Sequence, residues 1–331
     1  MKVGISLPQL GASATRQNIL QMAKRSEQEG FDSVWVSERI LWPLKPKTSF
    51  RGTSDGSFPV NMQNILDPLD TLTFVAANTK KITLGTSVVN MLFHNPVVLA
   101  KRFATLDVLS NGRVICGLGI GWSKDEYQVC NILYSQRGKR ADEFIQLLKK
   151  IWTDDVVEFK GQFYNIPASK IGPKPIQKPH IPIYLGGYSQ GTFARLVRYN
   201  ASGWVGFIGG PLKNIESMIN MLKDEAKRAK EDHKQFKIIL EGEIRIILNS
   251  TSNKDGQKRF PLTGTTEEVS SDLQRIKEKM DIDHIVFNFN TTPSEEKEKE
   301  KRGGGGIIDE EKKINIEETI KIAKQLSKFI K

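Results

Sequence analysis

Two glycine-rich loops carry the residue types best suited to binding an anion. The segment Gly186-Gly187-Tyr188-Ser189-Gln190-Gly191 follows an apolar run and opens a predicted helix. Its backbone N–H groups and the positive end of the helix dipole would converge on one spot, which favours negative charge. Gly119 and Gly121 form a second loop, with G-x-G spacing directly after another apolar run. A plain strand-to-helix turn is the alternative interpretation of either loop, because glycine is common in turns.

The residues before the second loop indicate how it is positioned. Residues 82–89 form an apolar, β-branched run, which is typical of a strand buried on both faces. Asn95 can cap the helix that follows, and Asn111-Gly112 can end it. A second buried run, 114–118, then leads into the glycines. Two parallel strands joined by a helix place such a loop at the carboxyl end of a sheet, where α/β proteins bind ligands.

The same alternation continues along the whole chain. Predicted strands cover residues 2–7, 33–37, 82–89, 114–118, 181–185, 203–207, 236–248 and 283–289, with helices between them. Eight strands alternating with helices predict one (β/α)₈ TIM barrel over residues 1–331, with insertions after strands 2, 4, 7 and 8. An open doubly wound sheet is the competing architecture, although its strand count is usually lower.

Several local signals refine this prediction. Residues 38–64 are too long and irregular for a simple connection, so we expect a functional lid or a disordered loop. Lys160-Gly161 predicts the turn of a short hairpin, and Thr265 with Glu268 predicts a capping box. The low-complexity charged segment 293–306 is expected to be solvated.

Composition limits the class of protein. The chain has 331 residues, of which 38% are hydrophobic, and no apolar run approaches the about 18 residues of a membrane span. It shows no signal-peptide pattern, and its two cysteines, Cys116 and Cys130, make a disulfide framework improbable. We therefore expect a cytoplasmic enzyme that acts on a small-molecule substrate, with no membrane partner and with homodimer formation left open.

The net charge of +11 does not by itself define a partner. Many of the basic residues alternate with acids on predicted helices, as on a solvated surface, and no basic stripe interleaves with aromatic residues. We therefore expect no nucleic-acid partner. A basic cluster in the long loop could still meet phosphate or carboxylate groups at a barrel mouth; its members are Arg39, Lys45, Lys47 and Arg51.

Four segments together resemble the bacterial luciferase-like superfamily, whose members bind flavin or its 5-deaza analogue in a (β/α)₈ barrel. They are SVWVSER, ITLGTSVVNMLFHNPVVLAKRFATLDVLSNGR, GLGIGWSKDEY and PIYLGGYSQGTFARLVRYNASGWV. The GLGIGW-x-x-x-EY form resembles the branch that uses coenzyme F420. The resemblance thus implies an oxidoreductase that transfers a hydride between F420 and a small organic substrate. An FMN-dependent monooxygenase using reduced flavin and O₂ is the first alternative, and a non-catalytic deazaflavin-binding protein is the second.

The resemblance also implies a set of cofactor-binding positions and no metal site. Ser87-Val88 stands where the family tends to have a non-prolyl cis peptide behind the ring, and the loop after 185 stands where it binds the phosphate. The implied cofactor-binding residues are Ser87, Val88, Val89, Asn90, Gly119, Ile120, Gly121, Tyr127, Gly186, Gly187, Tyr188, Ser189, Gln190 and Gly191.

Three residues are expected around the reacting centre: Glu38, Arg39 and Trp122. The family commonly has histidine at the position of Arg39, and some relatives have a proton-donating glutamate at that of Trp122. Arginine stays charged, so Glu38 is the better acid/base candidate, although it could simply hold an ion pair. His94 could face the ring or be an ordinary loop histidine.

The long loop also contains apolar residues that could cover a substrate or pack as local core. They are Trp42, Phe50, Phe58 and Met62. The resemblance further implies that the carboxylate-rich tail of the coenzyme runs outward over basic surface, for which Arg39 and Lys45 are candidates.

Overall fold

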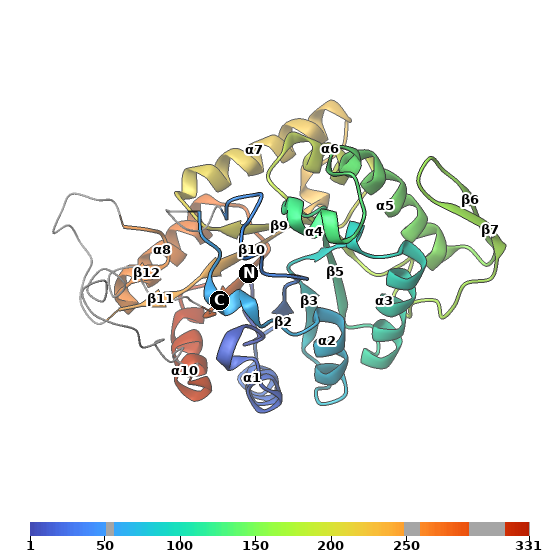
Figure 1. The fold of residues 1–331 in the computed structure, drawn as a ribbon. Coiled ribbons are helices and arrows are strands. Elements are labelled where there is room, and N and C mark those ends of the chain that lie inside the picture. The colour runs from blue at the N-terminus through green and yellow to red at the C-terminus, as the bar shows by residue number, and fades with distance from the viewer. Residues whose placement is uncertain (51–55, 248–258, 291–314, 331) are drawn as a thin grey trace.

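A closed parallel β-barrel forms the centre of the molecule (Figure 1). The computed structural model describes residues 1–50, 56–247, 259–290 and 315–330. Pairing between β3 and β5 closes the sheet into a barrel, which confirms the predicted fold. In the order of the chain the barrel strands are β1 (Lys2–Ser6), β2 (Ser33–Val36), β3 (Thr83–Thr86) continued by β4 (Val89–Asn90), β5 (Val114–Gly119), β8 (Ile183–Gly186), β9 (Gly203–Ile208), β10 (Lys237–Glu243) and β13 (His284–Asn288).

Helices surround the barrel, as Figure 1 shows. They are α1 (Arg16–Gln28), α2 (Pro68–Ala76), α3 (Pro96–Ser110), α4 (Lys124–Val129), α5 (Arg137–Thr153), α6 (Gln190–Arg198), α7 (Leu212–Arg228), α8 (Thr266–Lys279) and α10 (Ile316–Ser327). The predicted hairpin is present as β6 (Val157–Lys160) and β7 (Asn165–Ser169), which pair antiparallel and project from the barrel. Among the described residues, no helix is both long and apolar enough to pass through a membrane.

Local signals in the sequence set several helix ends as predicted. The Asn95 side chain accepts hydrogen bonds from the backbone N–H groups of Val97 and Val98 at the start of α3. Asn111 adopts a left-handed conformation with φ 57° where that helix ends. Thr265 and Glu268 form the predicted capping box of α8. The charged segment 293–306, Arg51 and Leu248 lie outside the described residues.

The third predicted strand differs from the structure, because residues 82–89 do not form one continuous strand. β3 ends at Thr86, the Ser87–Val88 peptide is cis as the resemblance implied, and β4 then resumes the pairing with β5. Thr86 Oγ1 accepts a hydrogen bond from Gly117 N at 2.9 Å and donates one to Gly117 O at 2.8 Å. These side-chain contacts replace the regular ladder at this point.

The seventh predicted strand is also shorter than expected. The barrel strand β10 ends at Glu243 instead of continuing to residue 248. The next residues form β11 (Arg245–Ile246), which pairs with β12 (Thr263–Gly264) outside the barrel. The predicted seventh strand is therefore divided between two sheets, a division that hydrophobicity alone does not reveal.

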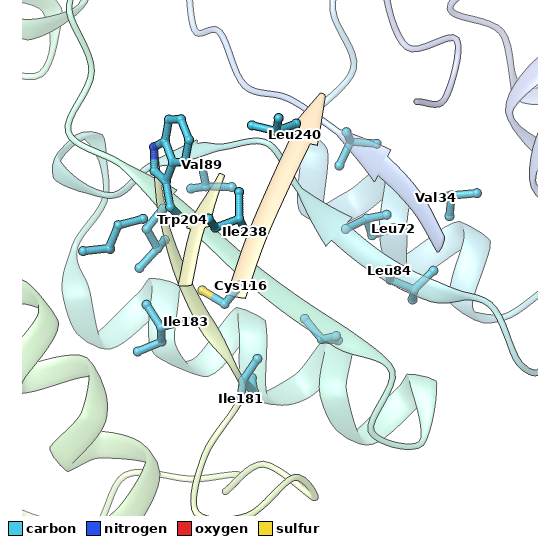
Figure 2. Close-up of a cluster of buried hydrophobic side chains, with 14 of the residues drawn as sticks. Val34, Leu72, Leu84, Val89, Cys116, Ile181, Ile183, Trp204, Ile238 and Leu240 are labelled. Atoms are coloured by element: carbon cyan, nitrogen blue, oxygen red, sulfur yellow. The ribbon is translucent and has the colours of Figure 1, made fainter. Parts of the chain in front are cut away.

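Barrel strands are buried on both faces, which explains their continuous apolar sequences. Side chains that face the helices, such as Val34, Leu84 and Leu240, form the larger core (Figure 2). Inside the barrel, a second cluster is formed by Trp35, Tyr184, Val205, Ile239 and Val286. The barrel interior is therefore a packed core.

A buried histidine lies at the amino-terminal end of the barrel interior. His284 Nε2 is 2.8 Å from Ser33 Oγ, which in turn accepts a hydrogen bond from Trp35 Nε1 at 2.6 Å. Burial lowers the pKa of His284 from 6.5 to about 4, although Asp32 and Asp283 partly oppose this effect. The imidazole is thus neutral in the folded protein when the unfolded chain already binds a proton.

We predict a loss of stability in acid that depends on His284. As the pH falls from 6.5 to about 4, the unfolded state is protonated first, so the free energy of unfolding should fall by up to about 3 kcal/mol. Denaturant unfolding across this range would measure the effect in the wild-type protein and in His284→Gln. The variant should lack this part of the decline, and equal declines in both proteins would contradict the assignment.

Candidate functional site

The predicted site residues gather at one end of the barrel. Glu38 and Arg39 follow β2, while Ser87 to Asn90 connect and form the end of β3–β4. Gly119 ends β5, and the loop of Gly186 to Gly191 joins β8 to α6. All these strands are parallel, so their carboxyl ends open on the same mouth, where (β/α)₈ barrels carry their ligands.

The glycines at the strand ends make room for Val88. A Cβ atom on Gly119 would lie 2.6 Å from Val88 Cγ2, and one on Gly186 would lie 2.9 Å from Val88 Cγ1. Val88 is half-buried and packs on the cluster inside the barrel. The absence of side chains at Gly119 and Gly186 leaves this space to Val88, which forms the floor of the mouth.

Gly121 and Gly187, one in each loop, adopt backbone conformations that favour glycine. Gly121 has φ +75°, and a Cβ there would meet the Phe93 ring at 2.7 Å. Gly187 has φ +131°, and its Cβ would meet Thr192 Oγ1 at 2.6 Å. Each loop is therefore fixed by a local steric requirement as well as by its turn.

A small pocket, with room for about one water molecule, lies between the two glycine loops. Its walls combine Ile120 of the first loop with Gly186, Thr192 and Arg195 around the second, and the remaining lining is apolar: Met91, Leu118 and Leu185. Tyr127 of α4 donates a hydrogen bond from its hydroxyl to Ile120 O. Burial raises the pKa of Tyr127, which keeps this donor protonated.

The start of α6 supplies polar groups to the same region. Ser189 precedes the first turn, and its hydroxyl lies 3.2 Å from Thr192 Oγ1 without capping the helix. Gln190 instead donates to Glu225 of α7 at 3.1 Å. Arg195 was not expected from the sequence; its Nε donates to Asp142 Oδ1 at 2.8 Å. Backbone N–H groups of the first turn remain the natural anion donors here.

Arg39 lies inside an aromatic cluster. Its guanidinium is 4.9 Å from the Phe58 ring and 4.8 Å from the Trp122 ring. Phe50 completes the cluster, with its ring centroid 5.8 Å from that of Trp122. The arginine side chain is only 9% exposed. The expectation that Arg39 belongs to a basic outer surface was therefore wrong, because stacking on aromatic faces buries its charge.

Glu126 of α4 is the charged partner of this arginine. Its Oε1 lies 3.4 Å from Arg39 Nη2 and accepts a hydrogen bond from Ile40 N at 3.1 Å. Burial raises the pKa of Glu126, while the positive charge of Arg39 lowers it. The pair anchors the start of the long loop, whose Phe50 and Phe58 pack on Trp122.

Sequence reasoning missed a buried carboxyl group beneath the mouth. Glu241 of β10 accepts hydrogen bonds from Ser6 Oγ at 2.8 Å, Ser87 Oγ at 2.5 Å and Asn288 Nδ2 at 2.6 Å. Burial raises the pKa of Glu241. The signal that could have revealed it was a carboxylate directly after the apolar residues Ile238, Ile239 and Leu240 of the predicted strand.

The fold is a (β/α)₈ barrel whose predicted site residues lie at the carboxyl ends of β2, β3–β4, β5 and β8. The chain belongs to the luciferase-like monooxygenase family, whose model matches residues 1–278. An F420-dependent glucose-6-phosphate dehydrogenase of Amycolatopsis mediterranei is 30% identical over 285 residues, covering 81% of this chain and 79% of that protein. The chain spans 65% of the length of uncharacterized mycobacterial relatives that it matches at 33% identity.

Solved structures share the fold over the whole chain. Monooxygenase RslO1 from Streptomyces bottropensis superimposes with a TM-score of 0.76 at 19% identity, covering 100% of this chain and 98% of that one. An F420-dependent secondary alcohol dehydrogenase in complex with an F420–acetone adduct gives a TM-score of 0.74 at 17% identity, covering 100% and 99%. At such identities the likeness establishes the fold alone.

The Val88 floor predicts a coupled pair of substitutions. Gly119→Ala should lower the free energy of unfolding by about 1–3 kcal/mol, because its methyl group overlaps Val88. In the Val88→Ala protein, Gly119→Ala should lower the free energy of unfolding by much less. Denaturant unfolding of both single variants and the double variant measures this coupling. Gly210→Ala, whose Cβ would sit 3.7 Å from Asn214 Nδ2, is the matched control. Strictly additive losses would exclude the contact.

Proposed function

We propose that this protein is an oxidoreductase that transfers a hydride between coenzyme F420 and a small organic substrate. The observation that carries the proposal is that Val88, the Gly119–Gly121 loop and the start of α6 lie together at the carboxyl ends of neighbouring strands. This arrangement supports an elongated ligand with a flat apolar part over Val88 and an anionic part at α6. The relative from Amycolatopsis mediterranei, whose printed name is an F420-dependent dehydrogenase, supports the same cofactor.

The residues of the mouth fit such a cofactor. Val88 offers a flat ring an apolar surface, while Ser189 and the first-turn N–H groups of α6 can hold a phosphate. When bound, the deazaflavin would supply a ring carbon that accepts or donates hydride. The protein's own task would be to hold the phosphate, orient the ring on Val88 and exclude water beneath the aromatic cluster.

The main alternative is an FMN-dependent monooxygenase. The fold of RslO1 and the family itself favour this alternative, since both are described as monooxygenases. Flavin mononucleotide has a comparable ring and phosphate, so the arrangement of the mouth alone does not separate the two cofactors. A non-catalytic deazaflavin-binding protein would have the same site without turnover.

Cofactor titration tests the proposal. We expect oxidised F420 to bind with micromolar or tighter affinity, measured by its fluorescence, and reduced F420 to transfer hydride without consuming O₂. Binding of FMN alone, with O₂ consumed when reduced flavin is supplied, would favour the monooxygenase. Tight F420 binding without turnover of any aldehyde, alcohol, enone or imine would favour the binding protein.

A serine substitution tests where the phosphate lies. Ser189→Ala should weaken F420 binding by about 1–2 kcal/mol, or roughly 5- to 30-fold, as expected for one hydrogen bond to a charged group. Ser217→Ala is a matched control, because Ser217 lies on α7 and donates to Lys213 O. Isothermal titration of both variants measures the difference. An unchanged affinity in Ser189→Ala would remove this hydroxyl from the phosphate site.

A further inference from the structure

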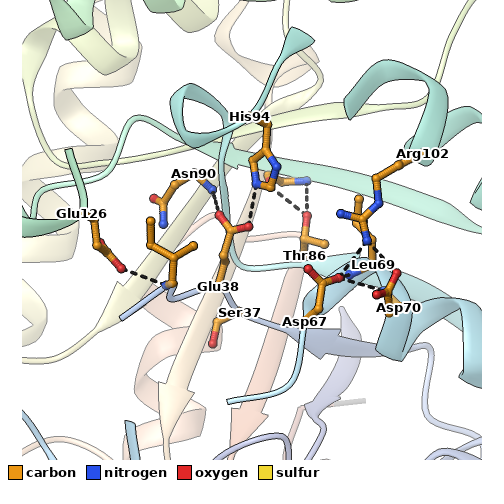
Figure 3. Close-up of polar contacts among 12 residues, drawn as sticks. Ser37, Glu38, Asp67, Leu69, Asp70, Thr86, Asn90, His94, Arg102 and Glu126 are labelled. Carbon is orange, nitrogen blue, oxygen red and sulfur yellow. Dashed lines mark hydrogen bonds and ion pairs between the residues drawn. The ribbon is translucent and has the colours of Figure 1, made fainter. Parts of the chain in front are cut away.

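Glu38 and His94 form a carboxylate–imidazole pair at the mouth of the barrel (Figure 3). Glu38 Oε1 lies 2.7 Å from His94 Nε2, and Oε2 accepts a hydrogen bond from Asn90 N at 2.7 Å. The Glu38 side chain is only 3% exposed, whereas that of His94 is 19% exposed. Both carboxylate oxygens are therefore engaged within the protein, while the imidazole has a second nitrogen to offer.

This contact selects one form of the imidazole. An ionised carboxylate can only accept a hydrogen bond, so Nε2 of His94 carries the proton and Nδ1 presents a lone pair. A carboxylate in this position also stabilises the imidazolium that forms when Nδ1 takes up a proton. The arrangement makes His94 a base and leaves Glu38 without a free oxygen for a substrate.

The pair lies beside the first glycine loop. Asn90, whose N–H binds Glu38, is in register with Gly119 across β4 and β5. Its Oδ1 would lie 3.4 Å from a Cβ on Gly119 and 3.5 Å from one on Gly121. His94 follows the 3-10 turn Met91–Phe93 that continues from this strand. His94 is thus linked through Glu38 to Asn90, whose side chain adjoins the loop on which the proposed function places the coenzyme.

The neighbouring charged groups are engaged elsewhere. Arg39 stacks on Phe58 and Trp122 and pairs with Glu126, and a guanidinium stays protonated at all relevant pH values. Glu126 binds Ile40 N as well as Arg39. The electrostatic neighbours of Glu38 include Glu126 and the Cys130 thiol. Among these groups, His94 has the nitrogen best placed to exchange a proton with a ligand.

We propose that His94 is the catalytic proton-transfer residue and Glu38 its positioning residue, for a substrate carbon that bears a hydroxyl group. This inference rests on the proposed function. In the oxidation direction, the C–H bond would break and its electron pair would leave as hydride, for which the bound oxidised deazaflavin would be the acceptor. The O–H bond breaks, its proton goes to His94 Nδ1, and a carbonyl forms. Reduction reverses these steps, with the imidazolium returning its proton to the oxygen.

The first test observes the imidazole and needs no substrate. The chain has 4 histidines, so His94→Gln and the control His233→Gln assign the NMR spectrum of [¹⁵N]histidine-labelled protein. We expect His94 in the Nε2–H form, and we expect its signals to change when oxidised F420 saturates the protein, while those of His233 do not. Glu38→Gln, whose amide both donates and accepts, should populate both forms. A proton on Nδ1, or His94 signals unchanged by bound coenzyme, would overturn the proposal.

The second test follows turnover of hydroxyl compounds that include glucose 6-phosphate and propan-2-ol. His94→Gln should bind F420 as the wild type does, lose roughly 100-fold or more in kcat and lack the histidine-dependent part of the kcat–pH profile. Added imidazole should restore part of the rate in His94→Ala, which a structural role would not produce. His233→Gln, at the amino-terminal end of the barrel, should keep full activity. Full kcat in His94→Gln would refute this inference, whereas a wild-type protein that binds no F420 would refute the proposed function.

Discussion

The mouth of the barrel depends on the contacts that the Val88 side chain makes with two glycines. It occupies the space that Cβ atoms on Gly119 and Gly186 would need, so the carboxyl ends of β3–β4, β5 and β8 are set by one residue. Ser87, on the other side of the same peptide, donates to the buried Glu241, which also binds Ser6 and Asn288. The packing of Val88 against the two glycines and the hydrogen bond from Ser87 to Glu241 thus fix the floor of the mouth.

Much of the fold could be predicted because it follows from local rules. The alternation of apolar strands and helices gave the barrel, and Asn95, Asn111 and the Thr265–Glu268 box marked helix ends where the structure has them. The positions of the glycine loops at strand ends also followed, since parallel strands share one carboxyl edge. The family resemblance, which the match over residues 1–278 confirms, added the cis peptide at Ser87–Val88.

Contacts between distant residues could not be predicted. Glu241 meets Ser6 and Asn288 only once the barrel closes, and nothing local to Arg39 indicates that Phe58 and Trp122 will bury it. The pairing of Glu38 with His94 likewise depends on how the turn after β4 folds back toward β2. The sequence named Glu38 as a candidate, but only the geometry shows that both its oxygens are already engaged. In each case a charged side chain has at least one partner from a distant segment of the chain.

A crystal structure of the protein with oxidised F420 would test the central claim most directly. The account predicts the deazaflavin ring on the Val88 side chain, the phosphate at the Ser189 turn and His94 Nδ1 facing the reactive edge of the ring. A ring bound away from Val88, or a phosphate held elsewhere than at the start of α6, would contradict it.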